Sequence, residues 1–378
     1  MQRRAHKYVR QARHFVRDYT AGVNVRDFRR LFDQDASRAY KVLTRDHDAG
    51  PEPTDDFKRL LYRIKVIFLG LSYKLTPARR ALFVICLLLA VFGLIEPPAF
   101  DFTSNNARIY LDFSPLLFLA SIVGLIWLLV MELVDRVRVR DELEVARQLQ
   151  QDLLPGAAPE VEGYRFAHSY RTANEVGGDY YDFQVLPGGR LALLMGDASG
   201  HGIGAGLLMA IANATLKTAL DLDPEPEAVA SLLNSALFRT GDRRAFMTLF
   251  YGLLDPPSGQ FDYVCAGHPF PMLRRAGGEI VELGQGTLPL GLRQTVELTR
   301  GSITIEPGDL LVLFTDGLPE AVDGPDGRAF SFERIRELLG SVGSSAVLHD
   351  RILLAFDQHV GHEPVTDDLT LVVMARSA

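Results

Sequence analysis

Four aspartates stand beside apolar, strand-like runs, and together they could hold divalent cations. They are Asp179 in EVGGDYYDF, Asp197 at the end of LALLMGD, Asp316 near the end of LLVLFTDG and Asp367 at the start of DDLTLVV. In antiparallel neighbours the end of one strand lies beside the start of the next, so we expect these carboxylates to gather on a single edge of a sheet. Gathered carboxylates repel one another unless cations offset their charge. Each aspartate alone could equally cap a strand or form a turn.

The donor types indicate which cations would bind. Carboxylate oxygens suit Mg²⁺ or Mn²⁺, and the sequence has no cysteine or histidine pattern suited to zinc. Its two cysteines, Cys86 and Cys265, can form neither a disulfide framework nor a four-cysteine zinc site. A carboxylate-bridged pair of such ions about 3.5–4 Å apart lowers the pKa of a bound water and holds a phosphoryl oxygen. A two-metal site of this kind is therefore one chemistry that the four aspartates together could support.

Four further polar residues lie within or near these motifs. His201 in SGHG could act as a general acid or could shape the turn into the next helix, and His268 in AGHP is expected in a strand-to-turn connection. We expect Asp182 and Asp368 to hydrogen-bond to metal ligands instead of binding metal themselves.

One glycine pattern offers a competing interpretation. Gly200, Gly202 and Ala205 satisfy G-x-G-x-x-A after a strand and before a helix, and Asp221 follows about 20 residues on, as in a dinucleotide-binding fingerprint. However, Asp221 directly follows the helix and leads into another helix, so the required second strand is missing. We expect the glycines to allow a sharp turn beside Asp197 instead.

Strands and helices in the second half of the chain must position the carboxylates. Apolar runs predict strands over 191–195, 246–254, 263–266, 310–314 and 369–374, and helical patterns occupy 205–220, 227–239, 332–339 and 346–360. Most of these strands are apolar on both faces, so their sheets must be covered on both sides. Helices come in pairs and strands in runs, which favours antiparallel sheets with helices outside. The expected fold class is a layered α/β sandwich.

The first part of the chain has the opposite charge. The 378-residue protein has a formal charge of −7, yet residues 1–80 carry 19 Lys and Arg against 9 Asp and Glu. Residues 1–48 predict short amphipathic helices, and 57–74 is a second basic amphipathic stretch, typical of a helix beside anionic lipid. An ordinary surface helix is the alternative. We expect no nucleic-acid partner, because the basic region contains no helix-turn-helix or zinc-finger pattern.

Two apolar runs, 81–95 and 113–131, predict a membrane hairpin joined by a short loop. The second approaches the roughly 20 residues that span a bilayer, and the residues from Pro77 onward can extend the first. A buried core helix is the alternative for the first run. Arginines flank the hairpin on its outer sides, at positions 79, 80, 136, 138 and 140. The positive-inside rule therefore places both of its ends in the cytoplasm.

A helical pattern continues from 132 to 154 and ends at a Pro-Gly pair. Five residues have the spacing of a coiled-coil seam with one polar interruption: Val139, Leu143, Ala146, Gln150 and Leu153. Such a seam would join two copies of the chain as a homodimer. The alternative is a single helix packed on the next domain.

Six motifs in order carry a family resemblance: EVGGDYYDF, GDASGHGIGAGLL, AGHPFPMLRR, LPLGL, LLVLFTDGLPEA and DDLTLVVM. With the lead-in ELEVARQLQQDLLP, they resemble the PPM metal-dependent protein serine/threonine phosphatases, in the bacterial SpoIIE/RsbU-like branch that regulates sigma-factor partner switching. The resemblance implies an αββα sandwich phosphatase domain over 159–378. Before it we expect a basic helical cytoplasmic region (1–76), a two-helix transmembrane hairpin (77–131) and a linker helix (132–158).

The resemblance also implies a site with two Mn²⁺ or Mg²⁺ ions. Asp197 would bridge both ions, and the Ala198 carbonyl would complete one shell. Asp316 and Asp367 would hold one ion, and Asp179 would serve the other directly or through water. A metal-activated water would hydrolyse phosphoserine or phosphothreonine on a regulatory protein, an anti-sigma-factor antagonist, without a covalent phosphoenzyme.

The predicted membrane hairpin, together with the bacterial branch, sets the expected location, and one alternative function stays open. The protein would be a multi-pass protein of the bacterial inner membrane with its phosphatase domain in the cytoplasm. The alternative is a catalytically weak or inactive phosphatase-fold module that acts as a membrane-tethered interaction protein. Retention of all four aspartates favours activity.

Overall fold

A computed structural model describes residues 54–95, 99–104, 107–240, 245–323, 327–340, 343–361 and 365–377, without the side chains of 99–112. The short helices predicted over 1–48 lie outside these residues. The chain divides into two compact units, Met1–Arg136 and Val137–Ala378.

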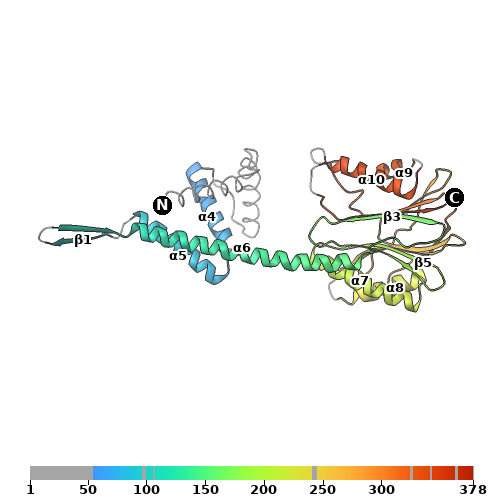
Figure 1. The fold of residues 1–378 in the computed structure, drawn as a ribbon, viewed down its shortest axis with the longest axis horizontal. Helices are drawn as coiled ribbons and strands as arrows, with labels where there is room; N and C mark the ends of the chain where they lie inside the picture. The colour runs from blue at the N-terminus through green and yellow to red at the C-terminus, as the bar shows by residue number, and fades with distance from the viewer. Residues whose placement is uncertain are drawn as a thin grey trace, which may run out of the picture. The chain divides into compact units, whose positions relative to one another are not determined.

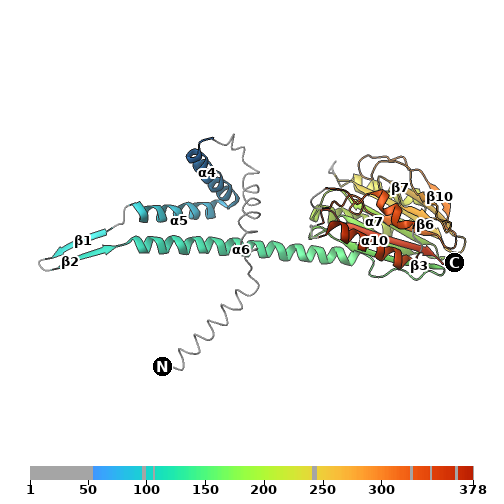
Figure 2. The same ribbon diagram turned by 90° about the horizontal axis from the view of Figure 1, so that it is seen from above.

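The described part of the first unit contains two helices, a β-hairpin and the start of a third helix. They are α4 (Asp56–Lys74), α5 (Pro77–Ile95), β1 (Ala99–Ser104), β2 (Ala107–Asp112) and α6 (Ser114–Leu153). The Asp55 carboxylate caps α4 by accepting hydrogen bonds from the backbone amides of Phe57 and Lys58. β1 and β2 pair antiparallel between α5 and α6, so the segment that was expected to be a loop is a hairpin (Figure 2).

Small residues and the ion pairs of Arg79 hold α5 against α6. The Cys86 side chain packs where Gly124 has no side chain, and the Ser121 hydroxyl donates a 2.8 Å hydrogen bond to the Cys86 carbonyl. Near the start of α5, the Arg79 guanidinium lies 2.6 Å from the Asp135 carboxylate. Most apolar side chains of both helices remain exposed in this unit, as in helices that contact lipid.

Three described helices are long and apolar enough to cross a membrane by length and composition: α5, α6 and α7 (Ile203–Leu222). α7 differs from the other two, because its buried residues pack into the core of the second unit beside α8 (Pro226–Phe238). The two helices α5 and α6 are therefore apolar enough for a membrane hairpin, whereas α7 is accounted for as a core helix.

Two five-stranded antiparallel sheets form the second unit (Figure 1). Sheet I has the order β10 (Gly301–Thr304), β7 (Gln260–Ala266), β6 (Met247–Asp255), β5 (Leu191–Ala198), β4 (Asp179–Val185). Sheet II has the order β3 (Tyr164–Arg171), β12 (Leu369–Arg376), β11 (Leu310–Phe314), β8 (Met272–Arg274), β9 (Ile280–Glu282). The five strands predicted from apolar runs are all present, and β3, β4, β8, β9 and β10 are additional.

Helices cover the outer face of each sheet (Figure 1). Apolar side chains of both sheets fill the space between them. α7 and α8 (Pro226–Phe238) lie on sheet I, and α9 (Phe332–Leu339) and α10 (Ser345–Val360) lie on sheet II. Alternation along β5 explains the layering: Leu194 packs under α7, whereas Leu193 points between the sheets. The expected αββα sandwich is confirmed.

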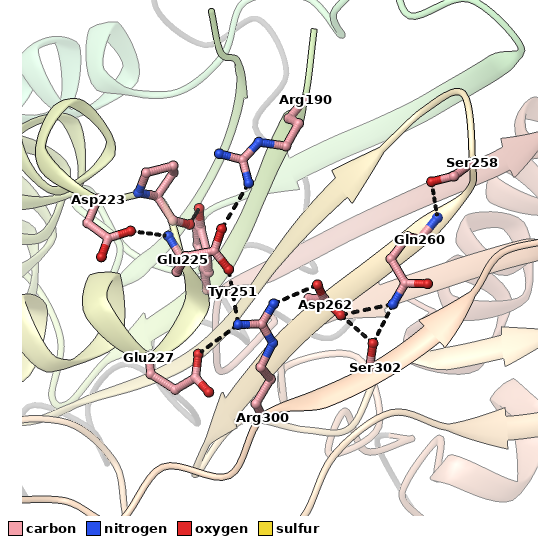
Figure 3. Close-up of polar contacts among 11 residues, drawn as sticks. Arg190, Asp223, Glu225, Glu227, Tyr251, Ser258, Gln260, Asp262, Arg300 and Ser302 are labelled. Carbon is pink, nitrogen blue, oxygen red and sulfur yellow. Dashed lines mark hydrogen bonds and ion pairs between the residues drawn. The ribbon is translucent and has the colours of Figure 1, made fainter. Parts of the chain in front are cut away.

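A charged network ties the connection between α7 and α8 to sheet I (Figure 3). Arg190 pairs with Glu225 at 2.9 Å, and Arg300 lies 3.0 Å from Glu225 and 2.7 Å from Asp262. The Tyr251 hydroxyl donates to a backbone carbonyl in the same connection at 2.8 Å. Arg190 directly precedes β5, so this network lies at the opposite end of that strand from Asp197.

α6 crosses the boundary between the units as one helix, and its last turns pack into the second unit. Gln150 is 4% exposed, and Leu153 packs against the core cluster under α7. The following domain therefore covers these two positions of the expected seam. This agrees with the alternative of a helix packed on that domain. Dimerisation through the rest of α6 and the domain boundary at 158/159 stay predictions.

Candidate metal centre

The four aspartates meet between the two sheets. Asp179 and Asp197 are direct partners in the register of β4 and β5 in sheet I. Asp316 follows β11 and Asp367 precedes β12, and these two strands are neighbours in sheet II. The carboxylates therefore gather at one end of the sandwich. The expectation of a single sheet edge was wrong, because β5 and β11 belong to different, facing sheets.

Two threonines of sheet II hold the carboxylate of Asp179 in sheet I. Thr315 and Thr370 donate hydrogen bonds to the same oxygen, Asp179 Oδ2, at 2.7 and 2.6 Å. The Thr370 amide donates to the Thr315 hydroxyl at 3.0 Å, which orients that hydroxyl. All three side chains are buried. Both threonines lie inside the aspartate motifs, LLVLFTDG and DDLTLVV, but nothing in their type or spacing marks them as functional.

The electrostatics indicate an excess of negative charge. Burial and then the nearby Asp316 and Asp367 raise the pKa of Asp197 to about 8. Burial and then Asp367 raise the pKa of Asp316 to about 6. Burial and then Asp197 raise the pKa of Asp179 well above its ordinary value, despite its two threonine donors. Carboxyl groups with raised pKa values in one cluster are characteristic of functional sites.

Asp368 fixes the loop that leads into β4. Its carboxylate accepts hydrogen bonds from the backbone amides of Gly178 at 2.6 Å and Ala173 at 2.8 Å. The Gly178 carbonyl in turn accepts from the Ala198 amide at 3.1 Å. A side chain at position 178 would lie 2.8 Å from the Ala198 carbonyl oxygen and 3.1 Å from Asp197 Oδ1. Only glycine therefore permits this close approach, and Asp368 acts by supporting it.

Asp182 has different partners from those expected. Its carboxylate accepts hydrogen bonds from the Tyr180 hydroxyl and the Gln184 side-chain amide, both at 3.0 Å. The same Tyr180 hydroxyl accepts a 2.9 Å hydrogen bond from Asn213 of α7. Asp182 thus helps attach α7 to β4. Its described hydrogen bonds do not include one to a residue expected to bind metal.

The two histidines lie in connections, as expected, but differ in burial. His201 is exposed in the turn before α7. His268 is buried, with Nδ1 2.9 Å from the Thr248 hydroxyl, and that hydroxyl accepts a 3.1 Å hydrogen bond from the Asp197 amide. Burial lowers the pKa of His268 to about 3, so the ring is neutral. His268 therefore supports the backbone of Asp197 through Thr248.

The G-x-G-x-x-A pattern forms the turn from β5 into α7. Gly200 and Gly202 have φ values of 91° and 71°, which side chains other than glycine rarely adopt. The next strand, β6, pairs antiparallel with β5, whereas a dinucleotide fingerprint requires a parallel strand–helix–strand unit. The glycines thus serve the turn beside Asp197.

The donor set fits divalent cations in type and in charge. It consists of carboxylate oxygens and the Ala198 carbonyl, the hard ligands that Mg²⁺ and Mn²⁺ prefer. Within the described residues, no group of three His, Cys, Asp or Glu side chains is placed so that it could hold a metal ion by itself. Backbone oxygen and water would therefore have to complete each shell, and Mg²⁺ commonly retains several waters.

The sequence of this chain is similar to those of known proteins. The sequence model of the family described as Stage II sporulation protein E (SpoIIE) matches residues 187–377. The chain belongs to the SpoIIE family. It is 29% identical over 251 residues to phosphoserine phosphatase RsbU of Bacillus subtilis (strain 168), covering 63% of this chain and 71% of RsbU.

Two further proteins are similar to this chain, one in sequence and one in fold. Protein IcfG of Synechocystis sp. is 26% identical over 266 residues, which cover 63% of this chain but only 42% of IcfG. The chain thus spans less than half the length of that relative. The SiaA-PP2C domain of Pseudomonas aeruginosa superposes with a TM-score of 0.57 at 20% identity, over 64% of this chain and 98% of that domain. This likeness supports a PP2C-like fold.

Proposed function

We propose that the chain is a membrane-anchored, metal-dependent phosphatase that hydrolyses phosphoserine or phosphothreonine on a regulatory protein. The observation that carries this proposal is the meeting of Asp179, Asp197, Asp316 and Asp367 between two sheets of a SpoIIE-family domain. The relative RsbU bears the name phosphoserine phosphatase, which supports the choice of substrate group.

Each aspartate would take a defined role toward two Mn²⁺ or Mg²⁺ ions. Asp197 would bridge both ions with the Ala198 carbonyl beside it, Asp316 and Asp367 would hold one, and Asp179 would serve the other directly or through water. When bound, such ions neutralise charge on phosphoryl oxygens and lower the pKa of water. The other residues orient these ligands: two threonine hydroxyls fix Asp179, and the hydroxyl of Thr248 fixes the backbone of Asp197.

The test is Mn²⁺-dependent hydrolysis of a phosphoserine protein by the full chain in detergent, with EDTA as control. Asp316→Asn should abolish turnover while the protein stays folded, because it removes a ligand charge. Asp350→Asn, at an exposed carboxylate on α10, should leave turnover unchanged. Near-normal turnover by Asp316→Asn would refute the site. A folded wild-type protein without Mn²⁺-dependent turnover would instead support the alternative of an inactive interaction module.

The proposed substrate is a phosphorylated anti-sigma-factor antagonist. The motifs resemble the branch that regulates sigma-factor partner switching, and this resemblance supports the substrate class. Candidate phosphorylated antagonists should therefore give a higher kcat/KM than an unrelated phosphoserine protein of similar size. Equal kcat/KM values for both would refute this assignment.

The proposed location is the inner membrane of a bacterial cell, with both ends of an α5–α6 hairpin in the cytoplasm. The exposed apolar side chains of both helices and the flanking arginines support it. With a membrane-impermeant maleimide, Asn105→Cys should react in intact spheroplasts, and Glu297→Cys only after lysis. Labelling of both cysteines, or of Glu297→Cys alone, in intact spheroplasts would refute the orientation.

We also propose two partners for the segments outside the sandwich. The basic region 1–76 would bind anionic lipid, which the exposed Phe57 and Ile64 of basic helix α4 support. Loss of residues 1–53 should then weaken binding to vesicles that contain anionic lipid. Two chains would pair along α6, where the seam residue Val139 is exposed. Val139→Glu should shift the detergent-solubilised protein from dimer to monomer.

A further inference from the structure

Gln150, near the end of α6, binds both backbone groups of a single residue beside the metal centre. Its Nε2 donates a 2.7 Å hydrogen bond to the Gly177 carbonyl, and its Oε1 accepts a 3.0 Å hydrogen bond from the Gly177 amide. Nε2 also lies 3.1 Å from the Tyr170 hydroxyl of β3. The side chain is almost completely buried. One amide side chain thus pairs with Gly177 as a neighbouring strand would.

The loop that Gln150 holds is packed on its other side. A side chain at Gly177 would collide with the Asp368 carboxylate and the Tyr170 hydroxyl. The next residue, Gly178, is bound at its amide by Asp368 and at its carbonyl by the Ala198 amide. Gln150 therefore completes the set of hydrogen bonds to the two residues that precede Asp179.

We propose that Gln150 is a positioning residue of the metal centre. By fixing the backbone of Gly177 and Gly178, it sets where the Asp179 carboxylate and the Ala198 carbonyl lie, and so it sets the affinity for Mn²⁺ or Mg²⁺. Without the amide, a buried donor and a buried acceptor of Gly177 lose their partner, and the loop relaxes to regain hydrogen bonds. This inference rests on the metal site of the proposed function.

Gln150 lies outside the expected phosphatase domain. It lies in α6, upstream of the expected boundary at residue 159, and the helix that carries it also contains the second apolar run. A catalytic domain that began at residue 159 would contain all four aspartates but would lack the residue that fixes the loop. We expect such a domain to bind Mn²⁺ more weakly than the full chain.

The test compares two variants of neighbouring glutamines in the full chain. Gln150→Met keeps the length of the side chain but removes its hydrogen bonds, and Gln151→Met makes the same change at an exposed position of α6. Calorimetric titration with Mn²⁺ alone should show at least a tenfold weaker Kd for Gln150→Met and no change for Gln151→Met.

Two further measurements separate positioning from a general loss of structure. Gln150→Asn retains the amide but is one methylene shorter, so it should also weaken Mn²⁺ binding. This variant decides the test if Gln150→Met fails to fold. In metal-free protein, amide exchange at Gly177 should be at least tenfold faster in either variant of Gln150. An unchanged Mn²⁺ affinity, or an equal loss in Gln151→Met, would overturn the inference.

The outcome is independent of whether the protein is a phosphatase. Binding is measured without substrate, so a wild-type chain that binds Mn²⁺ but hydrolyses no phosphoserine would refute the proposed function only, and Gln150→Met would still decide the present inference. A wild-type chain that binds no Mn²⁺ would refute both.

Discussion

The raised pKa of Asp197 predicts that Mn²⁺ must displace a proton to bind. The free carboxyl has a pKa of about 8, so it is about 1% ionised at pH 6 and half ionised at pH 8. Because the cation binds the ionised form, its affinity should rise about 50-fold between these pH values from Asp197 alone. Asp316, with a pKa of about 6, adds a factor of about two, and the raised pKa of Asp179 steepens the dependence further.

Calorimetry can measure both the affinity and the proton release. Mn²⁺ would be titrated into the full chain at pH 6, 7 and 8, in pairs of buffers that differ in ionisation enthalpy. At pH 7 we expect release of about one proton or more for each chain loaded. An affinity that does not change with pH, or the absence of proton release, would refute the electrostatic account of the site.

The same pKa fixes how the metal-free fold responds to pH. In the unfolded chain Asp197 ionises near its ordinary pKa of 3.8, whereas in the folded chain it keeps its proton to about pH 8. The folded state therefore loses stability as the pH rises through this interval, on the order of 3 kcal/mol between pH 5 and 8. Thermal unfolding in EDTA should show this loss, and saturating Mn²⁺ should reverse it. A melting temperature in EDTA that rises over this range would contradict the assigned cause.

Three substitutions test other contacts. Gly178→Ala should weaken Mn²⁺ binding about tenfold, because its methyl group would crowd the Ala198 carbonyl, whereas Gly204→Ala, which adds a methyl group in open space, should not. Thr370→Val should lower the free energy of unfolding by about 1–3 kcal/mol in denaturant titrations. Thr370→Ser keeps the hydroxyl and should lower this free energy by much less. Equal losses in the two variants would contradict the hydrogen-bond assignment. Gly124→Leu should separate α5 from α6 and make the first unit more sensitive to trypsin, with unchanged Mn²⁺ binding; unaltered proteolysis would contradict this packing.

The strands that the sequence predicted are those with continuous apolar character. β5 and β11 are buried along almost their whole length, so both faces are apolar and the pattern is plain. β3 mixes histidine, serine and arginine with aromatic residues because it lies at an edge of sheet II, and β8 and β9 have three residues each. Which sheet a strand joins depends on pairing between distant segments, so the sequence could not show that the aspartates come from both sheets.

The candidate site was predictable in its charged residues and not in their supports. Aspartates at strand ends stand out by type, whereas Thr370 and Asp179 are 191 residues apart and their contact is visible only in the fold. Gln150 falls at the spacing of a helical stripe, and this spacing predicts a coiled-coil seam. Periodicity identifies such a stripe but does not identify which neighbour covers it.

The central place of β12 in sheet II has a consequence for how the protein folds. This strand lies between β3 and β11, and Leu369 pairs with Arg171, so the first and last described strands of the unit are neighbours. Contacts between segments so distant in sequence form slowly, because a long loop must close first. A ribosome-bound chain that lacks β12 would contain α7, α8 and sheet I but would not hold Asp179 between the threonines. The ability to bind a cation should therefore be acquired late in folding, after sheet II closes.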